Sequence, residues 1–283
     1  ESGHEGTARA YASSLRSMQK YLGKKDFPFI KLSSRIISDY QGKLLASGIC
    51  DNTIGFYLHN IKALFRKGCR EMGLELPCPF RDISIKTEKT LKRSLDPVVI
   101  KTLSAIELEK DSPLSLARDI FMFSFYTRGM SFVDIALLKK RHVFPGEICY
   151  RRHKTDQLMR VGINKEISRI LERYKNVPGE YIFPLFPAER DPYAGYRSAY
   201  HRIRYSLGKI SRVIGLEFPL RLHAARHSWA TIAKVNGASV HVIGECLGHT
   251  SEKTTRIYLK ELDHSALDAV NNQVADFILA VDD

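Results

Sequence analysis

The sequence has little of what marks secreted, membrane-spanning or zinc-binding proteins. Its five cysteines are odd in number and none forms a C-x-x-C pair, which argues against a disulfide framework and against a zinc site. No apolar run approaches the ~18 residues that a membrane-spanning helix needs. The first residues, Glu1 to Glu5, lack the basic-then-apolar pattern of a signal peptide. We therefore expect a chain that works in the reducing cytoplasm without a membrane partner.

Two kinds of catalytic apparatus are absent as well. No glycine-rich loop ends in Lys followed by Ser or Thr, so the sequence does not predict ATP binding. No cluster of carboxylates predicts phosphoryl transfer by two metal ions. We therefore expect neither a cofactor nor a bound metal.

The sequence is instead rich in positive charge. Lys and Arg total 44 against 31 Asp and Glu, which gives a net charge of +13. Residues 1–96 carry +7 and residues 97–260 carry +12, whereas residues 261–283 hold six acidic side chains and no Lys or Arg. Positive charge in both halves of a chain favours a polyanionic partner, with nucleic acid as the first choice. The alternative is a basic surface that only maintains solubility.

The 283 residues suffice for two ordinary domains. Residues 1–85 place apolar side chains at helical spacing and predict a helical bundle with one basic surface, in which Asp51-Asn52-Thr53 forms a helix N-cap region. Residues 86–97 are polar and basic and predict a linker, with a surface loop as the alternative. Residues 98–283 predict a mostly α domain with a small antiparallel sheet, formed by a hairpin at 147–163.

His223 and Arg226 lie three residues apart near a predicted helix start, and therefore share a helix face. An arginine fork beside an imidazole suits a phosphate, because one group binds the oxygens and the other can move a proton. A structural His–Arg pair is the alternative. His223 and His227 also have the spacing of a zinc-protease helix, but Ala224 stands where that motif requires Glu, which excludes a metalloprotease.

A second motif, Leu-Gly-His, occupies residues 247–249. Gly248 is predicted to end the preceding helix in a left-handed turn. Thr250 or Ser251 can then cap a short helix that carries Tyr258. The alternative for Tyr258 is an aromatic side chain that packs at an interface.

Together these motifs resemble the catalytic domain of the tyrosine recombinases, the phage integrase family. That family carries H-x-x-R, then L-G-H, then a tyrosine nine residues later, and Tyr258 is nine residues beyond His249. The resemblance extends over nearly the whole chain. It implies a helical core-binding domain at 1–85, a linker at 86–97 and a catalytic domain at 98–283.

The resemblance also implies a lysine in the turn of the β-hairpin, and Lys154, followed by Thr155, matches it. The basic neighbours Arg151, Arg152 and Arg160 are interpreted as phosphate contacts or as solvated charge.

A further arginine is implied near the end of an early catalytic-domain helix, three residues before an acidic side chain. Arg128 is the only arginine between 119 and 140, so we assign it to this role. It departs from the pattern, because it lies six residues before Asp134 and Ser131 occupies the usual position. We expect the turn at Gly129 to bring the guanidinium to the same point. The alternative is an ion pair between Arg128 and Asp134.

The resemblance implies cleavage of DNA without a metal, through a 3′-phosphotyrosyl intermediate. The implied catalytic residues are Arg128, Lys154, His223, Arg226, His249 and the nucleophile Tyr258. The two arginines would hold the non-bridging oxygens with a hydrogen bond from His249, His223 would act as the base, and Lys154 would protonate the leaving 5′ oxygen.

Residues 264–281 predict an amphipathic C-terminal helix with one apolar face. In the family such a helix docks on a neighbouring protomer, so the resemblance implies a homo-oligomer, a tetramer, on double-stranded DNA. Packing on its own domain is the alternative. Accessory DNA-bending proteins are further partners that the resemblance allows, and the bacterial nucleoid is the expected location.

The function that we favour is site-specific recombination, in integration, excision or inversion of DNA. A type IB topoisomerase is one alternative, but the core-binding-like first domain and the terminal helix favour a recombinase. A catalytically inactive DNA-binding protein derived from a recombinase is another, and the complete residue set argues against it.

Overall fold

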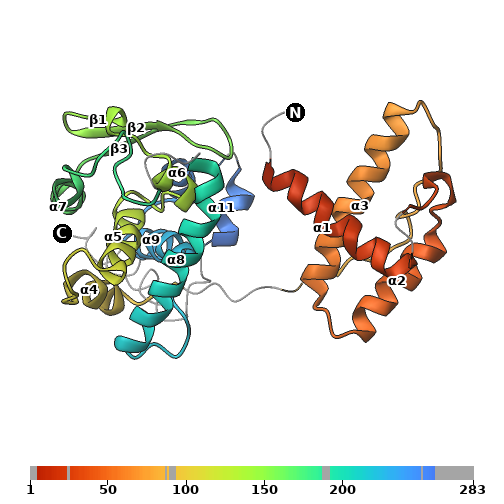
Figure 1. The fold of residues 1–283 in the computed structure, drawn as a ribbon, viewed down its shortest axis with the longest axis horizontal. Coiled ribbons are helices and arrows are strands. Elements are labelled where there is room, and N and C mark those ends of the chain that lie inside the picture. The colour runs from red at the N-terminus through yellow and green to blue at the C-terminus, as the bar shows by residue number, and fades with distance from the viewer. Residues whose placement is uncertain are drawn as a thin grey trace, which may run out of the picture. The chain divides into compact units, whose positions relative to one another are not determined.

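The computed structural model describes residues 5–23, 26–86, 88, 94–186, 192–249 and 251–258. The chain divides into two compact units, Glu1–Leu91 and Lys92–Asp283, shown in Figure 1. Most of the described residues are helical, and the strands form one small antiparallel sheet. The predicted fold class is therefore confirmed. Among the described helices, none has the length and apolar character needed to cross a bilayer.

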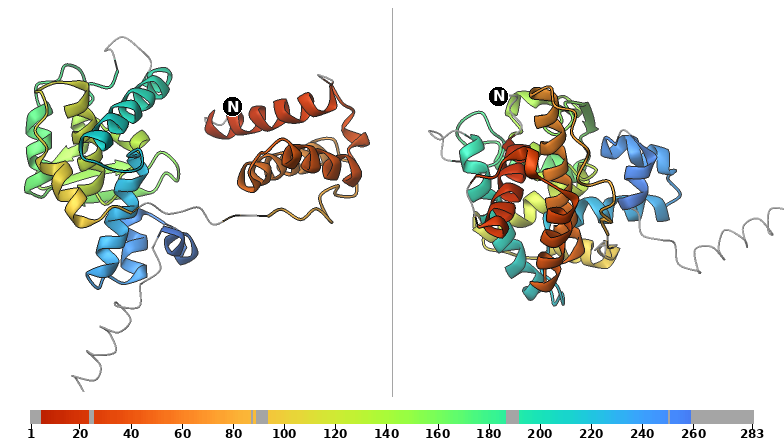
Figure 2. Two further views of the ribbon diagram at one scale, coloured as in Figure 1. Left: turned by 90° about the horizontal axis from the view of Figure 1, so that it is seen from below. Right: turned by 90° about the vertical axis from the view of Figure 1, so that its right-hand side faces the viewer.

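The first unit contains α1 (Glu5–Leu22), a short 3₁₀ helix (Phe29–Lys31), α2 (Ser34–Ala46) and α3 (Asp51–Glu71). Helix α3 packs against both α1 and α2, and Figure 2 shows α1 running alongside it. Its buried apolar side chains recur every three or four residues, which is the pattern of a helix with one face in a core; they are Ile54, Leu58, Ile61 and Phe65.

The predicted N-cap region of α3 is wrong by one residue. Cys50 is the N-cap, and Asp51 already belongs to the first helical turn, where its carboxylate is favoured by the positive end of the helix dipole. Asn52 instead binds the backbone of Glu88 through two hydrogen bonds, of 3.0 and 3.1 Å. Gln41 similarly donates to the carbonyl of Ser84 at 2.9 Å. The predicted linker is thus attached to α3 at Glu88, and the segment that precedes it is attached to α2 at Ser84.

The second unit is built around α5 (Pro113–Tyr126), whose middle is buried on every side. Helix α5 packs against five other helices; these are α4 (Pro97–Ala105), α6 (Phe132–Ala136), α7 (Lys165–Tyr174), α8 (Pro192–Val213) and α9 (Leu222–Val235). The apolar content of α5 follows from this position. Since α5 ends at Tyr126, two residues before Arg128, its burial fixes the place from which that arginine extends.

The sheet lies at one edge of this unit and has the order β1-β2-β3, with every pair antiparallel. Its strands are β1 (Val143–Phe144), β2 (Glu147–Arg151) and β3 (Leu158–Gly162), preceded by a 3₁₀ helix at Lys140–His142. Alternate side chains of β2 and β3 are buried. The predicted hairpin at 147–163 is confirmed, and β1 was not predicted because two residues show no alternation.

Three helices complete the described part of this unit: α9, α10 (Val240–Leu247) and α11 (Glu252–Tyr258). Helix α10 packs against both α9 and α11. The hydroxyl of Ser251 accepts from the backbone N–H of Thr254, so the predicted cap of the last helix is confirmed at Ser251. The predicted C-terminal helix at 264–281 lies outside the described residues.

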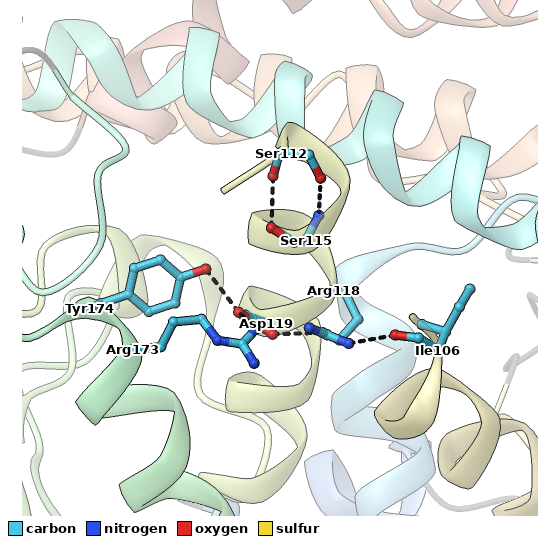
Figure 3. A network of polar contacts seen from close by, with 7 residues as sticks. All are labelled: Ile106, Ser112, Ser115, Arg118, Asp119, Arg173 and Tyr174. Atoms are coloured by element: carbon cyan, nitrogen blue, oxygen red, sulfur yellow. Dashed lines mark hydrogen bonds and ion pairs between the residues drawn. The ribbon is translucent and has the colours of Figure 1, made fainter. Parts of the chain in front are cut away.

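A buried carboxylate joins α5 to its neighbours (Figure 3). Asp119 accepts hydrogen bonds from Arg118 and Arg173, both at 2.6 Å, and from the Tyr174 hydroxyl at 2.9 Å. Arg118 also donates to the carbonyl of Ile106, in the segment after α4. Burial and the adjacent carboxylate both raise the pKa of Tyr174. A buried charge is tolerated only when it is paired, so this network links α5 to α7 and to the segment after α4.

Candidate active site

Arg226 lies at the centre of the candidate site, on α9, with only 5% of its surface exposed. Its Nη1 donates to the carbonyl of Gly129 at 2.8 Å, and its Nη2 donates to the carbonyl of Leu247. Gly129 has a φ of +75°, and a Cβ added there would come within 2.5 Å of the Arg226 side chain. No side chain fits at residue 129 without displacing Arg226, because the turn after α5 packs directly on α9.

His249 contacts Arg226 on one side and α11 on the other. Its Nε2 is 3.0 Å from Arg226 Nη2, and its Nδ1 is 3.0 Å from the hydroxyl of Thr255. Burial lowers the pKa of His249 to about 4, assisted by the positive charges of Arg226, Arg152 and Lys154. The imidazole is therefore neutral at neutral pH. We call the buried Arg226 and Thr255, together with the half-buried His249 between them, the buried cluster.

The turn that carries His249 depends on Gly248. Gly248 ends α10 in the left-handed conformation, with φ 63° and ψ 45°, so the predicted helix end is confirmed. A Cβ at this position would lie 2.9 Å from Met159 Sδ on β3. The β-hairpin thus packs directly against this turn.

Arg152 binds the same turn and corrects one interpretation of the sequence. Its Nη1 donates to the carbonyl of Gly248 at 2.5 Å, and the residue is half-buried. It is therefore not merely solvated charge. Arg151 is exposed and pairs with Asp156 at the surface, as a solvated residue would. No local sequence pattern separates these two arginines: Arg151 is the last residue of β2 and Arg152 follows it, and only the tertiary structure directs one of them toward residue 248.

Arg128 follows α5 in a left-handed turn, with φ +60°, and is half-buried. Burial raises the pKa of Tyr150, and the charges of Arg152, Arg226 and Arg128 act in the opposite direction. The charges of all three arginines therefore reach the same phenol. The only side-chain hydrogen bond of Arg128 among the described residues is a long one, of 3.5 Å, to the carbonyl of Arg160.

The alternative of an ion pair between Arg128 and Asp134 is wrong. Asp134 is buried and accepts from the Ser131 hydroxyl at 2.6 Å and from the backbone N–H of His153 at 2.8 Å. Ser131 is also the N-cap of α6. The residue that stands where the family pattern has an arginine therefore binds the carboxylate, and Asp134 in turn holds the hairpin turn that carries Lys154.

Lys154 and His223 are both exposed. Lys154 lies in the turn between β2 and β3, and its charge contributes to the low pKa of His249, so it is within electrostatic reach of the buried cluster. His223 lies in the first turn of α9, with its ring 4.7 Å from that of His227 at an angle of 88°. We call Arg128, Lys154 and His223 the rim residues.

Tyr258 is the last residue of α11, and its side chain lies outside the described residues. The helix itself packs against α9 and α10, which carry Arg226 and the Gly248 turn. In the described ranges, no three His, Cys, Asp or Glu side chains gather as metal ligands.

A basic groove of about 660 Å³ lies between α8 and the segment that precedes α9. Its lining includes Arg204, Arg212 and Arg221 against a single carboxylate, Glu217. Arg221 is the N-cap residue of α9, two positions before His223. No sequence pattern indicates this groove, because its basic residues come from a helix and a loop with no common spacing.

Comparisons with known proteins agree with this arrangement. The profile of the Phage integrase family matches residues 94–264, and that of the Phage integrase SAM-like domain matches residues 1–80. Tyrosine recombinase XerC of Shewanella oneidensis is 26% identical over 226 residues, which span 76% of this chain and 70% of that protein.

Two solved structures show a similar fold at low sequence identity. The Tn1549 transposon integrase in complex with transposon right end DNA has a TM-score of 0.71 at 15% identity, covering 97% of this chain and 95% of that one. The lambda integrase tetramer bound to a Holliday junction has a TM-score of 0.63 at 16% identity, covering 89% of this chain and 70% of that one.

Proposed function

This chain belongs to the phage integrase family and is a DNA recombinase of the tyrosine type, and we propose that it cleaves and rejoins DNA at specific sites through a 3′-phosphotyrosyl link to Tyr258. The observation that carries this proposal is the contact between Arg226 and His249. These residues belong to two different motifs and lie 23 positions apart in the sequence. Helix α11, which ends at Tyr258, packs beside that contact.

The arginines supply charge for the transition state. Attack on a phosphodiester builds negative charge on its non-bridging oxygens, and donors already fixed in place stabilise that charge at little reorganisation cost. Arg226 suits this role because two carbonyls hold its guanidinium. Arg128 is the second arginine that we assign, since its charge reaches the same phenol, that of Tyr150.

His249 has a narrower role in this proposal than the sequence suggested. An arginine only donates hydrogen bonds, so the Nε2 that faces Arg226 carries a lone pair. A hydrogen bond from this nitrogen to a phosphate oxygen would require the ring proton to move from Nδ1 to Nε2. In the state described here, His249 orients Arg226.

The remaining roles concern protons. A tyrosine hydroxyl has an unperturbed pKa of about 10, so Tyr258 needs a base and a cationic environment to attack at neutral pH. His223 is the base that we assign, and Lys154 is the acid that protonates the leaving 5′ oxygen. The energy of the broken bond is retained in the phosphotyrosine, so rejoining needs no ATP, and no step of this route uses a metal.

The basic groove is our proposed site for one strand of the DNA backbone, because its arginines are suited to phosphates. On duplex DNA each neutralised phosphate adds about 0.9 to the slope of log affinity against log salt. We expect Arg204→Ala and Arg212→Ala each to reduce this slope by about one. Unchanged slopes would place the DNA elsewhere.

We propose assembly as a homotetramer on double-stranded DNA, with the predicted helix at 264–281 as the link between protomers. The lambda integrase tetramer on a Holliday junction, which shares the fold, supports this proposal. Integration, excision or inversion of DNA in the bacterial cytoplasm, at the nucleoid, is the biological setting that we propose, with room for DNA-bending accessory proteins.

Covalent capture tests the proposal. The protein is incubated with sheared, lightly nicked genomic DNA of the organism that encodes it, and DNA that stays attached after denaturation is sequenced. We expect one enriched sequence with the wild type and none with Tyr258→Phe, which should still bind DNA in a mobility-shift assay. An adduct formed by Tyr258→Phe, or DNA binding by the wild type without any adduct, would refute the proposal.

A second assay separates a recombinase from a topoisomerase. Two marked duplexes that carry the captured sequence should exchange strands in the presence of the wild-type protein. Relaxation of supercoiled DNA without strand exchange would identify a type IB topoisomerase instead.

A further inference from the structure

Thr255 is a polar residue that the proposed chemistry does not use, yet it is completely buried. It lies on α11, which has only seven residues. An isolated helix of this length is not stable in water, so tertiary contacts must hold α11 in place. The hydroxyl of Thr255 makes one of these contacts, at 3.0 Å from His249 Nδ1.

The second ring nitrogen of His249 determines which atom donates in this contact. Arg226 Nη2, 3.0 Å from His249 Nε2, carries only donor hydrogens, so Nε2 must accept. The ring is neutral at neutral pH, because burial lowers the pKa of His249 to about 4. Its single proton is therefore on Nδ1, and the Thr255 hydroxyl oxygen accepts it.

The space for Thr255 comes from α10. A Cβ added at Gly244 would lie 2.8 Å from Thr255 Oγ1, so any larger residue at 244 would displace the hydroxyl. The carbonyl of Gly244 also accepts from the backbone N–H of His249 at 2.9 Å. Gly244 thus has two roles. Its carbonyl binds the backbone N–H of His249, and its missing side chain leaves room for the Thr255 hydroxyl that contacts the His249 ring.

We propose that Thr255 is a positioning residue that docks α11, and with it Tyr258, onto the pair formed by His249 and Arg226. Residues three apart lie on neighbouring positions of one helix face, so an α11 docked at Thr255 carries Tyr258 into a defined place. The same hydrogen bond keeps the His249 proton on Nδ1 and leaves Nε2 to accept from Arg226. The position of the tyrosine helix and the orientation of the phosphate-binding arginine are thereby coupled. This inference rests on the proposed role of Tyr258 in cleavage.

The test compares two substitutions of Thr255 with one of its neighbour. Thr255→Val keeps the shape and removes the hydroxyl, whereas Thr255→Ser keeps the hydroxyl. Thr254→Val is the matched control, because Thr254 is exposed on the same helix and its hydrogen bonds within the described residues go to Ser251. The first readout is the ¹⁵N NMR spectrum of the histidine rings, which distinguishes the two tautomers, with the His249 signals assigned from their loss in His249→Gln.

We expect the Nδ1–H tautomer for His249 in the wild type, in Thr255→Ser and in Thr254→Val. Thr255→Val should show a mixture with the Nε2–H form, because the Nδ1–H loses its acceptor. The second readout is the rate of covalent adduct formation on the captured DNA. Thr255→Val should lower it about 10- to 100-fold, the factor that corresponds to one buried donor without a partner. Thr255→Ser should restore most of that rate, and the control should not change it.

Two results would overturn the inference: an Nε2–H tautomer in the wild-type protein, or wild-type tautomer signals and adduct rate in Thr255→Val. The wild-type tautomer decides the question even if Thr255→Val fails to fold. Failure of the proposed function is recognised separately, since the wild type would then bind DNA without forming an adduct while the NMR spectrum still reports the contact of Thr255.

Discussion

The two halves of the candidate site differ in how firmly the protein holds them. In the buried cluster, Arg226 donates to two carbonyls and to His249, and His249 contacts Thr255. Among the rim residues, Lys154 and His223 are exposed, and the Arg128 side chain has one hydrogen bond, at 3.5 Å, within the described ranges. The first half is preassembled, whereas the second remains accessible to a substrate.

This difference indicates a division of labour. Residues that must have one orientation are held by backbone carbonyls, because carbonyls on packed elements move little. Residues that bind a large polyanion stay at the surface. There the charged ends of Lys and Arg remain in water until a phosphate binds, so they need no buried partner. A substitution in the buried cluster should therefore affect both folding and chemistry, and a substitution at the rim should affect chemistry alone.

The largest effect is expected at a rim residue. Lys154→Ala should slow cleavage of ordinary DNA by the roughly 10²–10⁴-fold typical of general acid catalysis, with the free energy of unfolding unchanged. A substrate with sulfur as the 5′ leaving atom needs no proton, because a thiolate leaves readily, so the variant should cleave it at nearly the wild-type rate. Single-turnover cleavage of both substrates measures this. Equal loss on both would show that Lys154 only positions DNA.

The next prediction compares the two arginines directly. Arg226→Ala and Arg128→Ala should each lower the rate of adduct formation by about 10²–10³-fold, as expected when one donor to a developing oxyanion is removed. Only Arg226→Ala should also destabilise the fold, by about 1–3 kcal/mol for each buried carbonyl left without its donor. Urea unfolding measures the second effect. Equal destabilisation by both variants would contradict the distinction between buried cluster and rim.

Arg152 belongs neither to the buried cluster nor to the rim residues, so its substitution tests the distinction between them. Arg152→Ala should lower adduct formation about tenfold, because the carbonyl of Gly248 loses its donor and the His249 turn becomes less fixed. DNA affinity should change little. Arg151→Ala is the matched control, since its exposed ion pair with Asp156 contributes little. If both variants behave alike, the contact between Arg152 and Gly248 does not contribute to cleavage.

The smallest effect concerns the pH dependence of stability. The unfolded chain protonates His249 as the pH falls through about 6.5, whereas the folded chain does so only near pH 4. Between these values the unfolded state binds more protons, so falling pH favours unfolding. The contribution of His249 is complete above pH ~6.5 and is lost toward pH ~4, on the order of 1–3 kcal/mol.

His249→Gln isolates that contribution, because it removes the titration and leaves the other groups. Its free energy of unfolding should fall less than that of the wild type when urea denaturation is repeated at neutral and mildly acidic pH. Parallel losses in the two proteins would mean that His249 is not buried as a neutral ring.

The fold was largely predictable from local patterns. Helical spacing of apolar residues predicted α1 to α3, and alternation predicted the hairpin of β2 and β3. The short elements β1 and α6 were missed, because two and five residues show no period. For the site, spacing predicted that His223 and Arg226 share α9 and that Gly248 ends α10.

The sequence alone could not show which charged side chains bind to distant parts of the fold and which stay at the surface. Arg151 and Arg152 are adjacent and chemically identical, yet one pairs at the surface and the other binds a carbonyl 96 positions away. Asp134 looked like a partner for Arg128, but it holds Ser131 and the backbone of the hairpin turn. Such contacts depend on the distance between elements, which no periodicity encodes.

The sequence by itself determined the chemical groups of this protein, their order and their local geometry, because helix faces, turns and net charge follow from residue type and spacing over a few positions. The tertiary structure decided how those groups meet. Packing of the α5 turn against α9 gives Arg226 its carbonyl partner, and packing of α11 against α10 places Thr255 on His249. Close contacts of this kind arise only when separate elements are packed to within van der Waals distance, and that is a property of the whole fold.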